Sequence, residues 1–407
     1  MSRTRSAFDV RPLRPATIEA ILAGRYPDAR VQHVQVVEQA RCGDGVASTA
    51  DRVTIGLDYA PGSDAGLPAR MMLKTLLLHP ALRFGMPGIR ALARAARGAE
   101  AVPLLGRPAR SLLFVLVGLY QKLYPHAPDA MYVNEARFYA EIRPELSIEA
   151  PRTFGSLFDE RTRQFGILME DLTLRSARFP NVTTTVSLGE VTGVIETLAE
   201  LHAPFWSSPR LRGDLSWVPT RLTGGMFPVF DGIGRELIRY QVDSNPFKAD
   251  LLRPLGRSVD QLWRDLWRSQ EILAAGPATL LHGDTHIANT YLLPNGRGGL
   301  LDWQLMARGT WANDVTYLLV TALTSEERRQ HERSLIAHYL DELRRHGVAA
   351  PPSHEDAWRY HRLAVIWGLV IGWLITPPVN YGIPITSTNI ARLVTAAEDL
   401  ESFRALD

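Results

Sequence analysis

Two carboxylates and an amide in the C-terminal half have a spacing that suits a magnesium site. Asp284 precedes Asn289 by five residues and Asp302 by 18. The residues between Asn289 and Asp302 include Pro-Asn-Gly-Arg-Gly-Gly and predict a hairpin that returns Asp302 to the side of Asn289. Magnesium prefers hard oxygen ligands, which amides and carboxylates supply. The spacing therefore predicts that Asn289 and Asp302 hold Mg²⁺.

Two histidines in the same loop offer a different metal chemistry. His282 and His286 flank Asp284, and a His-x-Asp-x-His cluster could bind a transition metal. The chain has one cysteine, Cys42, and no further ligands gathered near this loop in the sequence. The alternative is that both histidines brace the loop through hydrogen bonds, and the spacing of the oxygen ligands favours it.

These residues resemble the signature of a known family. His282-Gly-Asp-Thr-His-Ile-Ala-Asn followed by Asp302-Trp-Gln is similar to the motif of the aminoglycoside phosphotransferase and choline kinase superfamily. Three further segments extend the resemblance over most of the chain from about residue 31 to 325, and two of them are most similar to the ecdysteroid kinase-like branch. The segments are Leu198-Ala-Glu-Leu-His-Ala-Pro-Phe-Trp and, for that branch, Asn134-Glu-Ala-Arg-Phe-Tyr and Leu168-Met-Glu-Asp-Leu.

The resemblance implies a reaction and roles for the loop. The γ-phosphate of ATP would pass to a hydroxyl group of a small molecule, with Mg²⁺ on Asn289 and Asp302. Asp284 would face the acceptor hydroxyl and take up its proton, because catalysis in this class is mainly positioning and charge neutralisation. Asp314 would tie down the catalytic loop, although its place at the start of a helix also suits an ordinary N-cap.

The resemblance also assigns nucleotide-binding residues in the N-terminal part. Lys74 would contact the ATP phosphates and Glu135 would aim it through an ion pair. Lysine is rare in this chain, which has three lysines, and a compact ammonium suits phosphate oxygens. A lysine that reaches into water from a strand edge, and a solvated glutamate, are the alternatives.

Two further segments are nucleotide-binding candidates with weaker signals. Gly43 and Gly45, with Ser48 after them, could form a phosphate-binding loop, but a Gly-x-Gly is equally typical of a plain hairpin turn. The segment that includes Met169 and Asp171 would supply backbone hydrogen bonds to adenine, a role that depends little on the side chain.

The elements that must position these residues predict an α+β, two-lobed, protein-kinase-like fold. Alternating segments that begin at Val31 and Arg52, and a buried run from Met71, indicate a small antiparallel sheet. We expect an N-lobe over residues 1–168, with a helical insert at about 79–130, and a mainly helical C-lobe over residues 169–407 that carries the catalytic loop and the acceptor site. The insert would cap the cleft or form a subunit contact, unless it only completes the core of the small lobe.

Composition excludes several classes of protein. The 407 residues are 46% hydrophobic and 22% charged, as in an ordinary globular protein, and the formal charge of +2 does not favour a nucleic-acid partner. The uncharged run over residues 363–375 is shorter than the ~20 residues that a membrane span requires, and it predicts a buried core helix instead. With a polar N-terminal segment, the expectation is a cytoplasmic protein, and the oligomeric state stays undetermined.

The acceptor itself is only weakly indicated. Between residues 303 and 407 there are 12 acidic and 10 basic residues, which does not favour a polycationic aminoglycoside. Aromatic residues of that region could form a pocket for a hydrophobic alcohol such as a steroid or macrolide, or could be ordinary core. They are Trp311, Trp358, Tyr360, Trp367, Trp373 and Tyr381. An aminoglycoside or choline-type kinase, and a non-catalytic nucleotide-binding protein of the same fold, remain alternatives.

Overall fold

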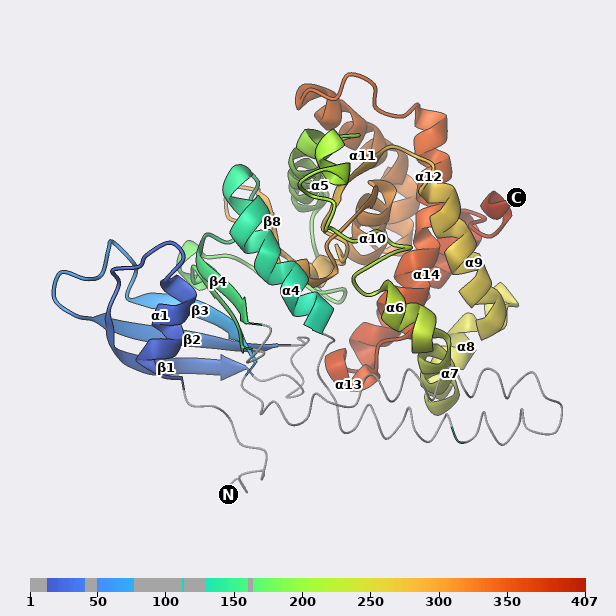
Figure 1. Cartoon of the computed structure of the whole chain (residues 1–407). Helices are drawn as coiled ribbons and strands as arrows, with labels where there is room; N and C mark the ends of the chain where they lie inside the picture. Colours follow the sequence, from blue (N-terminus) through green and yellow to red (C-terminus); the bar gives the residue numbers. More distant parts are fainter. Residues whose placement is uncertain (1–12, 41–49, 77–111, 113–128, 160–163) are drawn as a thin grey trace. The chain divides into compact units, whose positions relative to one another are not determined.

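The computed structural model describes residues 13–40, 50–76, 112, 129–159 and 164–407. The chain divides into two compact units, which Figure 1 shows coloured along the sequence. The first, here called the sheet unit, comprises residues 1–145 and 151–174. The second, here called the helical unit, comprises residues 146–150 and 175–407.

The sheet unit is built on five antiparallel strands. Their order in the sheet is β1-β2-β3-β5-β4, so that β3 lies in the middle between β2 and β5. The strands are β1 (Val31–Ala40), β2 (Asp51–Tyr59), β3 (Arg70–Thr75), β4 (Thr153–Asp159) and β5 (Gln164–Met169). The predicted antiparallel sheet is therefore confirmed, and β4 is a strand that the sequence patterns did not indicate.

Two helices pack on this sheet. Helix α1 (Pro15–Leu22) buries Ile18, Ile21 and Leu22 in a core with the apolar side chains of β2 and β3. It approaches closely because β4 has glycine at position 155, where a Cβ atom would overlap the backbone carbonyl oxygen of Ile21. Helix α4 (Asp129–Arg137) contacts β4 and β5 and continues into a π-helical turn over Phe138–Ile142.

The helical unit contains ten α-helices and two short two-stranded sheets among its described residues. Strand β6 pairs with β9 and β7 pairs with β8, in each case antiparallel. The helices are α5 (Leu188–His202), α6 (Phe227–Val229), α7 (Arg235–Ser244), α8 (Pro246–Leu252), α9 (Val259–Leu273), α10 (Ala312–Ala322), α11 (Ser325–Arg345), α12 (His354–Trp367), α13 (Pro378–Tyr381) and α14 (Ile383–Asp399), of which α6 is a single turn. The strands are β6 (Ala278–Leu281), β7 (Thr290–Leu292), β8 (Gly298–Leu300) and β9 (Ala307–Thr310).

The main core of the helical unit surrounds the uncharged run that the sequence identified. Helix α12 and the π-helical segment Gly368–Leu374 that continues it bury almost all of their apolar side chains against α7, α9, α10 and α14. This confirms the prediction of a buried core helix. Among the described residues, no helix combines the length and the apolar character that a membrane crossing requires.

These elements confirm the predicted α+β fold class, with an antiparallel sheet in one unit and a mainly helical second unit. The hairpin predicted between Asn289 and Asp302 is also present, as β7 and β8. The expected insert at about 79–130 lies almost entirely outside the described residues, and its proposed roles stay predictions.

Candidate active site

The candidate catalytic loop, residues 282–289, connects β6 to β7. Asp314 in the first turn of α10 binds the backbone of this loop. The carboxylate of Asp314 accepts hydrogen bonds from the backbone N–H groups of His282, at 2.7 Å, and Gly283, at 2.9 Å. Burial alone would raise the pKa of Asp314, but the hydrogen bond with His202 and the nearby positive charges hold it below its usual value. Asp314 is therefore a buried carboxylate anchor for the loop rather than an N-cap of its own helix.

Glycine is required at position 283 of this loop. Its φ angle of 91° lies in the left-handed region, and a Cβ atom there would overlap the carbonyl oxygen of Leu305. Only glycine adopts this conformation without strain. The backbone thus turns sharply directly before Asp284 and presents it at the end of β6.

Asn289 holds Asp284 in place. Its side-chain nitrogen donates to the backbone carbonyl of Asp284 at 2.8 Å and to the Oδ2 atom of the same residue at 3.0 Å. Burial and the negative charge of Asp302 raise the pKa of Asp284 to about 7, against the opposing effects of Arg221 and Asn289. The loop and the hairpin therefore gather Asp284, Asn289 and Asp302, as their spacing predicted.

The donor set fits a magnesium ion. Because the Asn289 nitrogen is committed to Asp284, the amide oxygen is the atom that Asn289 can offer to a cation. Asp302 follows β8 with a φ angle of 66°, an unusual conformation for an aspartate that directs the chain away from the hairpin at this point. An amide oxygen and a carboxylate are hard ligands of the kind that Mg²⁺ takes.

Of the two histidines expected to brace the loop, His282 does so through hydrogen bonds, whereas the Nδ1 atom of His286 is buried without a hydrogen-bond partner among the described residues. His282 donates from Nε2 to the carbonyl of Leu301 at 2.7 Å and accepts at Nδ1 from the N–H of Asp284 at 3.2 Å, as a neutral imidazole can. Burial lowers the pKa of His286 to about 3, so this ring stays neutral among aromatic neighbours. Both ring nitrogens of His282 are occupied by the protein, which argues against the transition-metal alternative.

In the sheet unit, Lys74 and Glu135 form a buried ion pair. The Nζ atom of Lys74 lies 2.8 Å from Oε1 and 2.7 Å from Oε2 of Glu135. Lys74 is on the central strand β3 and Glu135 is on α4, and both side chains are buried. Neither residue is the solvated surface side chain that the alternative reading described.

The other nucleotide-binding candidates of the sheet unit are less informative. The Asp171 carboxylate closes the turn after β5, since it accepts from Arg70 Nε at 2.6 Å and from the N–H of Thr173 at 3.0 Å. Met169 is the last residue of β5 and is buried. Gly43, Gly45 and Ser48 lie outside the described residues. The roles of these five residues in nucleotide binding remain predictions.

The model of the phosphotransferase enzyme family matches residues 116–350, which is more than half of the chain. The chain belongs to this family. No curated protein matches it in sequence. The matched range includes the whole catalytic loop and Asp314, but not Lys74.

Solved structures with a similar chain course include three kinases of small molecules. Choline kinase LicA from Streptococcus pneumoniae is 14% identical with a TM-score of 0.40, over 93% of this chain and 98% of that one. Aminoglycoside phosphotransferase APH(3'')-Id from Streptomyces rimosus is 15% identical with a TM-score of 0.40, over 87% of this chain and 98% of that one. Plasmodium vivax ethanolamine kinase is 12% identical with a TM-score of 0.47, over 94% of this chain and 84% of that one. Likenesses this distant do not identify the acceptor.

An aromatic cluster lies beside the catalytic loop of this family member. The ring of His286 is 5.5 Å from that of Trp373 and 6.0 Å from that of Tyr381, and these two rings are 5.0 Å apart. Tyr317 of α10 completes the cluster at 5.8 Å from His286 and interacts electrostatically with Asp284. The cluster therefore borders the residue that would face an acceptor.

The other aromatic candidates from the sequence have different surroundings. Trp311 stacks on Tyr339 at 4.8 Å in the core, and Trp358 packs under the guanidinium of Arg333 at 3.7 Å. Of the six residues considered, Trp373 and Tyr381 belong to the cluster at the loop. Trp311, Trp367 and Trp373 are buried, as the alternative of an ordinary core expects.

Arg221 contacts the catalytic loop and escaped the sequence reasoning. Its Nη2 atom donates to the carbonyl of Gly283 at 2.7 Å, and its guanidinium lies 3.9 Å from the ring centre of Trp367. Burial lowers the pKa of Arg221 to about 10, so it is a cation at neutral pH facing Asp284 and Asp314. A lone arginine in a loop, 62 residues from its partner, carries no recognisable pattern.

Proposed function

We propose that this family member transfers the γ-phosphate of ATP to a hydroxyl group of a small molecule. The observation that carries the proposal is the catalytic loop itself. Asp284, Asn289 and Asp302 converge on one end of the β6 strand and the β7–β8 hairpin, and Asp314 holds the loop backbone through two charge-assisted hydrogen bonds. Phosphoryl transfer needs this combination of a positioned carboxylate and metal-binding oxygens.

Each residue of the loop has a distinct part in the proposed reaction. Asp284 would orient the acceptor hydroxyl and receive its proton, and the hydrogen bonds from Asn289 keep its carboxylate from rotating away. Asn289 and Asp302 would hold Mg²⁺, which when bound neutralises charge on the transferred phosphoryl group. In the sheet unit, Lys74 would bind phosphate oxygens of ATP while Glu135 fixes the ammonium.

For the acceptor, the aromatic cluster supports a hydrophobic alcohol such as a steroid or macrolide. Tyr381 is partly exposed and packs with the buried rings of Trp373 and His286 near Asp284, and the pKa of His286 is too low for it to carry charge at neutral pH. The proposed membership of the ecdysteroid kinase-like branch rests on the sequence likeness of Asn134-Glu-Ala-Arg-Phe-Tyr and Leu168-Met-Glu-Asp-Leu. The aminoglycoside alternative would need acceptor-binding carboxylates beyond Asp302 and Asp314, which have other roles in the proposed reaction, and the aromatic cluster supplies none.

The test combines nucleotide binding with an acceptor screen. The full chain should gain thermal stability with ATP and Mg²⁺ together, and a library of hydroxyl compounds should contain acceptors that become phosphorylated. The screen should include steroid, macrolide, aminoglycoside and choline-type alcohols at equal concentration. If ATP with Mg²⁺ binds but no compound is phosphorylated and ATP is not consumed, the non-catalytic alternative replaces the proposal.

A further inference from the structure

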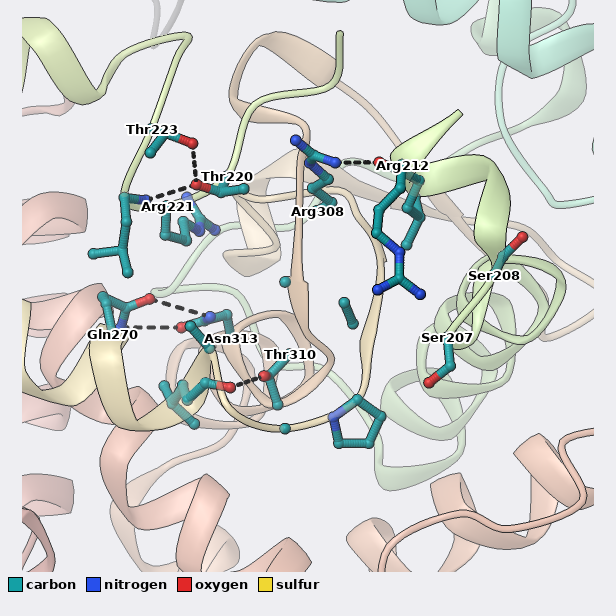
Figure 2. A pocket seen from close by; sticks show the side chains of 18 residues that line it. Ser207, Ser208, Arg212, Thr220, Arg221, Thr223, Gln270, Arg308, Thr310 and Asn313 are labelled. Atoms are coloured by element: carbon teal, nitrogen blue, oxygen red, sulfur yellow. Dashed lines mark hydrogen bonds between the residues drawn. The ribbon is translucent and has the colours of Figure 1, made fainter. Parts of the chain in front are cut away.

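The helical unit contains a cavity that the proposed reaction does not use. Its volume is about 540 Å³, within the range of about 300–1,000 Å³ that is common for small-molecule sites. Figure 2 shows the lining, which comes from the loop after α5, the C-terminal end of α9, strands β6 and β9 and the start of α10. Asp284, Asn289 and Asp302 are not among the lining residues.

Three arginines and no acidic side chain line the cavity. They are Arg212, Arg221 and Arg308, and Figure 2 shows the guanidinium of Arg212 directed toward the middle of the lining. Many arginines of the helical unit have carboxylate partners, as Arg257 has in Asp265 at 2.6 Å, whereas Arg392 donates to a backbone carbonyl. Within the described part of the chain, none of the three forms an ion pair with a carboxylate within 4.0 Å, although Arg221 feels the charges of Asp284 and Asp314 at longer range.

Two of these arginines are fixed in place yet keep an unsatisfied donor. Arg221 is only 8% exposed and is held by the carbonyl of Gly283 and the ring of Trp367. Arg308 donates from one terminal nitrogen to the carbonyl of Leu211. The Nε atoms of both are buried and have no hydrogen-bond partner among the described residues. Because an unpaired buried donor is costly, a ligand that accepts hydrogen bonds would relieve that cost.

The rest of the lining combines neutral polar groups with an apolar wall. The side-chain amides of Gln270 and Asn313 face each other, and Asn313 Nδ2 donates to Gln270 Oε1 at 3.3 Å. This is a long, weak hydrogen bond that a ligand could replace with a shorter one. Leu273 and Pro277 contribute apolar surface. A ligand with an oxyanion at one end and an apolar body at the other matches both parts.

We propose that this cavity binds a small organic anion, whose carboxylate or phosphate group pairs with Arg212, Arg221 and Arg308 and whose apolar body packs on Leu273 and Pro277. Guanidinium groups suit both oxyanions because their planar donors match two oxygens at once. The site is separate from the transfer site and requires neither ATP nor Mg²⁺. Its failure would therefore leave the proposed phosphotransferase activity standing.

Isothermal titration calorimetry on the full chain, without nucleotide, tests the proposal with three probes of one shape. Benzoate supplies a carboxylate, phenylphosphonate supplies a phosphate-like group and benzamide is the neutral control. We expect saturable binding of one anion per chain by at least one of the two anionic probes, and no binding of benzamide. The anion that binds more tightly identifies which oxyanion the site prefers.

Matched charge-removing variants locate the binding. Arg212→Gln removes an exposed guanidinium of the lining and Arg308→Gln a half-buried one, whereas Arg253→Gln removes an exposed arginine elsewhere in the same unit. We expect affinity to fall about tenfold or more in the first two and to stay unchanged in the third, since hydrogen bonds to charged groups are worth at least that factor. The assignment would be overturned if neither anion binds at millimolar concentration. It would also be overturned if all three variants bind the anion with equal affinity.

Discussion

Replacing Asp314 with asparagine tests whether the catalytic loop depends on a buried carboxylate. The wild-type side chain accepts from the N–H groups of His282 and Gly283 and interacts with His202 Nε2 at 3.2 Å. Asparagine has the same shape but one acceptor oxygen, so its amide nitrogen must face one of these donors. The variant therefore loses the charge and at least one hydrogen bond, and it leaves a buried donor unpaired.

The expected cost follows from those contacts. A hydrogen bond to a charged group contributes about 1.5–3 kcal/mol, and an unsatisfied buried donor adds about 1–3 kcal/mol. We therefore expect Asp314→Asn to lower the free energy of unfolding of the helical unit by about 3–6 kcal/mol. Phosphate transfer should also fall, because the backbone that presents Asp284 loses its anchor.

Helix α12 offers a matched control. Asp356 occupies the third position of α12 as Asp314 does in α10, but it is exposed and its carboxylate contacts only the Ser353 hydroxyl, at 2.7 Å, among the described side chains. Asp356→Asn should cost about 0.3–1 kcal/mol, the usual effect of a charge near a helix N-terminus. Urea unfolding followed by tryptophan fluorescence suits both variants, because all nine tryptophans lie at or after Trp206. Equal destabilisation by the two variants would refute the anchoring role.

The pH dependence of the same experiment has a definite sign. The folded-state pKa of Asp314 lies below its usual value, so its stabilising effect is complete above the unfolded pKa of about 3.9 and is lost as pH falls through the folded value. The stability difference between wild type and Asp314→Asn should therefore be present in full above about pH 3.9 as far as Asp314 itself is concerned, and should shrink below it. A difference that stays the same as pH falls below about 3.9 would contradict this account.

Three further substitutions test the proposed roles. Asp284→Asn should reduce turnover by about 10²-fold or more while ATP affinity stays within a few-fold, measured by kinetics and calorimetry; loss of ATP binding would contradict its place at the acceptor. Asp302→Asn should weaken Mg²⁺-dependent nucleotide binding about tenfold or more, and an unchanged metal requirement would remove it from the metal site. Glu135→Gln should destabilise the sheet unit by about 3–5 kcal/mol because Lys74 stays buried without its partner. The double variant Lys74→Met, Glu135→Leu should regain thermal stability but not ATP affinity; recovery of both would show that the pair is only structural.

The parts of the site that sequence reasoning reached are those with short-range patterns. Asp284, Asn289 and Asp302 lie within 19 consecutive residues, and a tight hairpin leaves few ways to arrange them. Lys74 and Glu135 are 61 residues apart, and here the family resemblance supplied the pairing that composition alone could not. Strand β4 was not predicted because Gly155 interrupts its pattern, although that glycine is what admits α1.

The parts that escaped are decided by contacts between distant segments. Arg221 reaches Gly283 from a loop without regular structure, and nothing in its neighbours distinguishes it from other arginines of this arginine-rich chain. The aromatic residues show the same limit. Trp311 and Trp373 are both buried tryptophans in helical segments, yet one packs in the core on Tyr339 and the other stands beside the catalytic loop. Periodicity predicts burial in each case but cannot say which neighbour a buried ring will have.

The rarity of lysine proves more informative than the sequence alone suggested. Of the three lysines, the family resemblance gives a role to Lys74 and none to Lys248. Lys248 is in fact fully buried, and its ammonium donates to the carbonyls of Trp373, Leu374 and Thr376 at 3.2, 2.9 and 2.7 Å. These carbonyls end the π-helical segment that carries Trp373, and they converge on one point. A tetrahedral ammonium meets three converging acceptors, whereas a planar guanidinium spreads its donors along a fork. Lys248 therefore fixes the backbone at Trp373, a member of the aromatic cluster. A compact ammonium suits these carbonyl oxygens for the same reason that it suits phosphate oxygens at position 74.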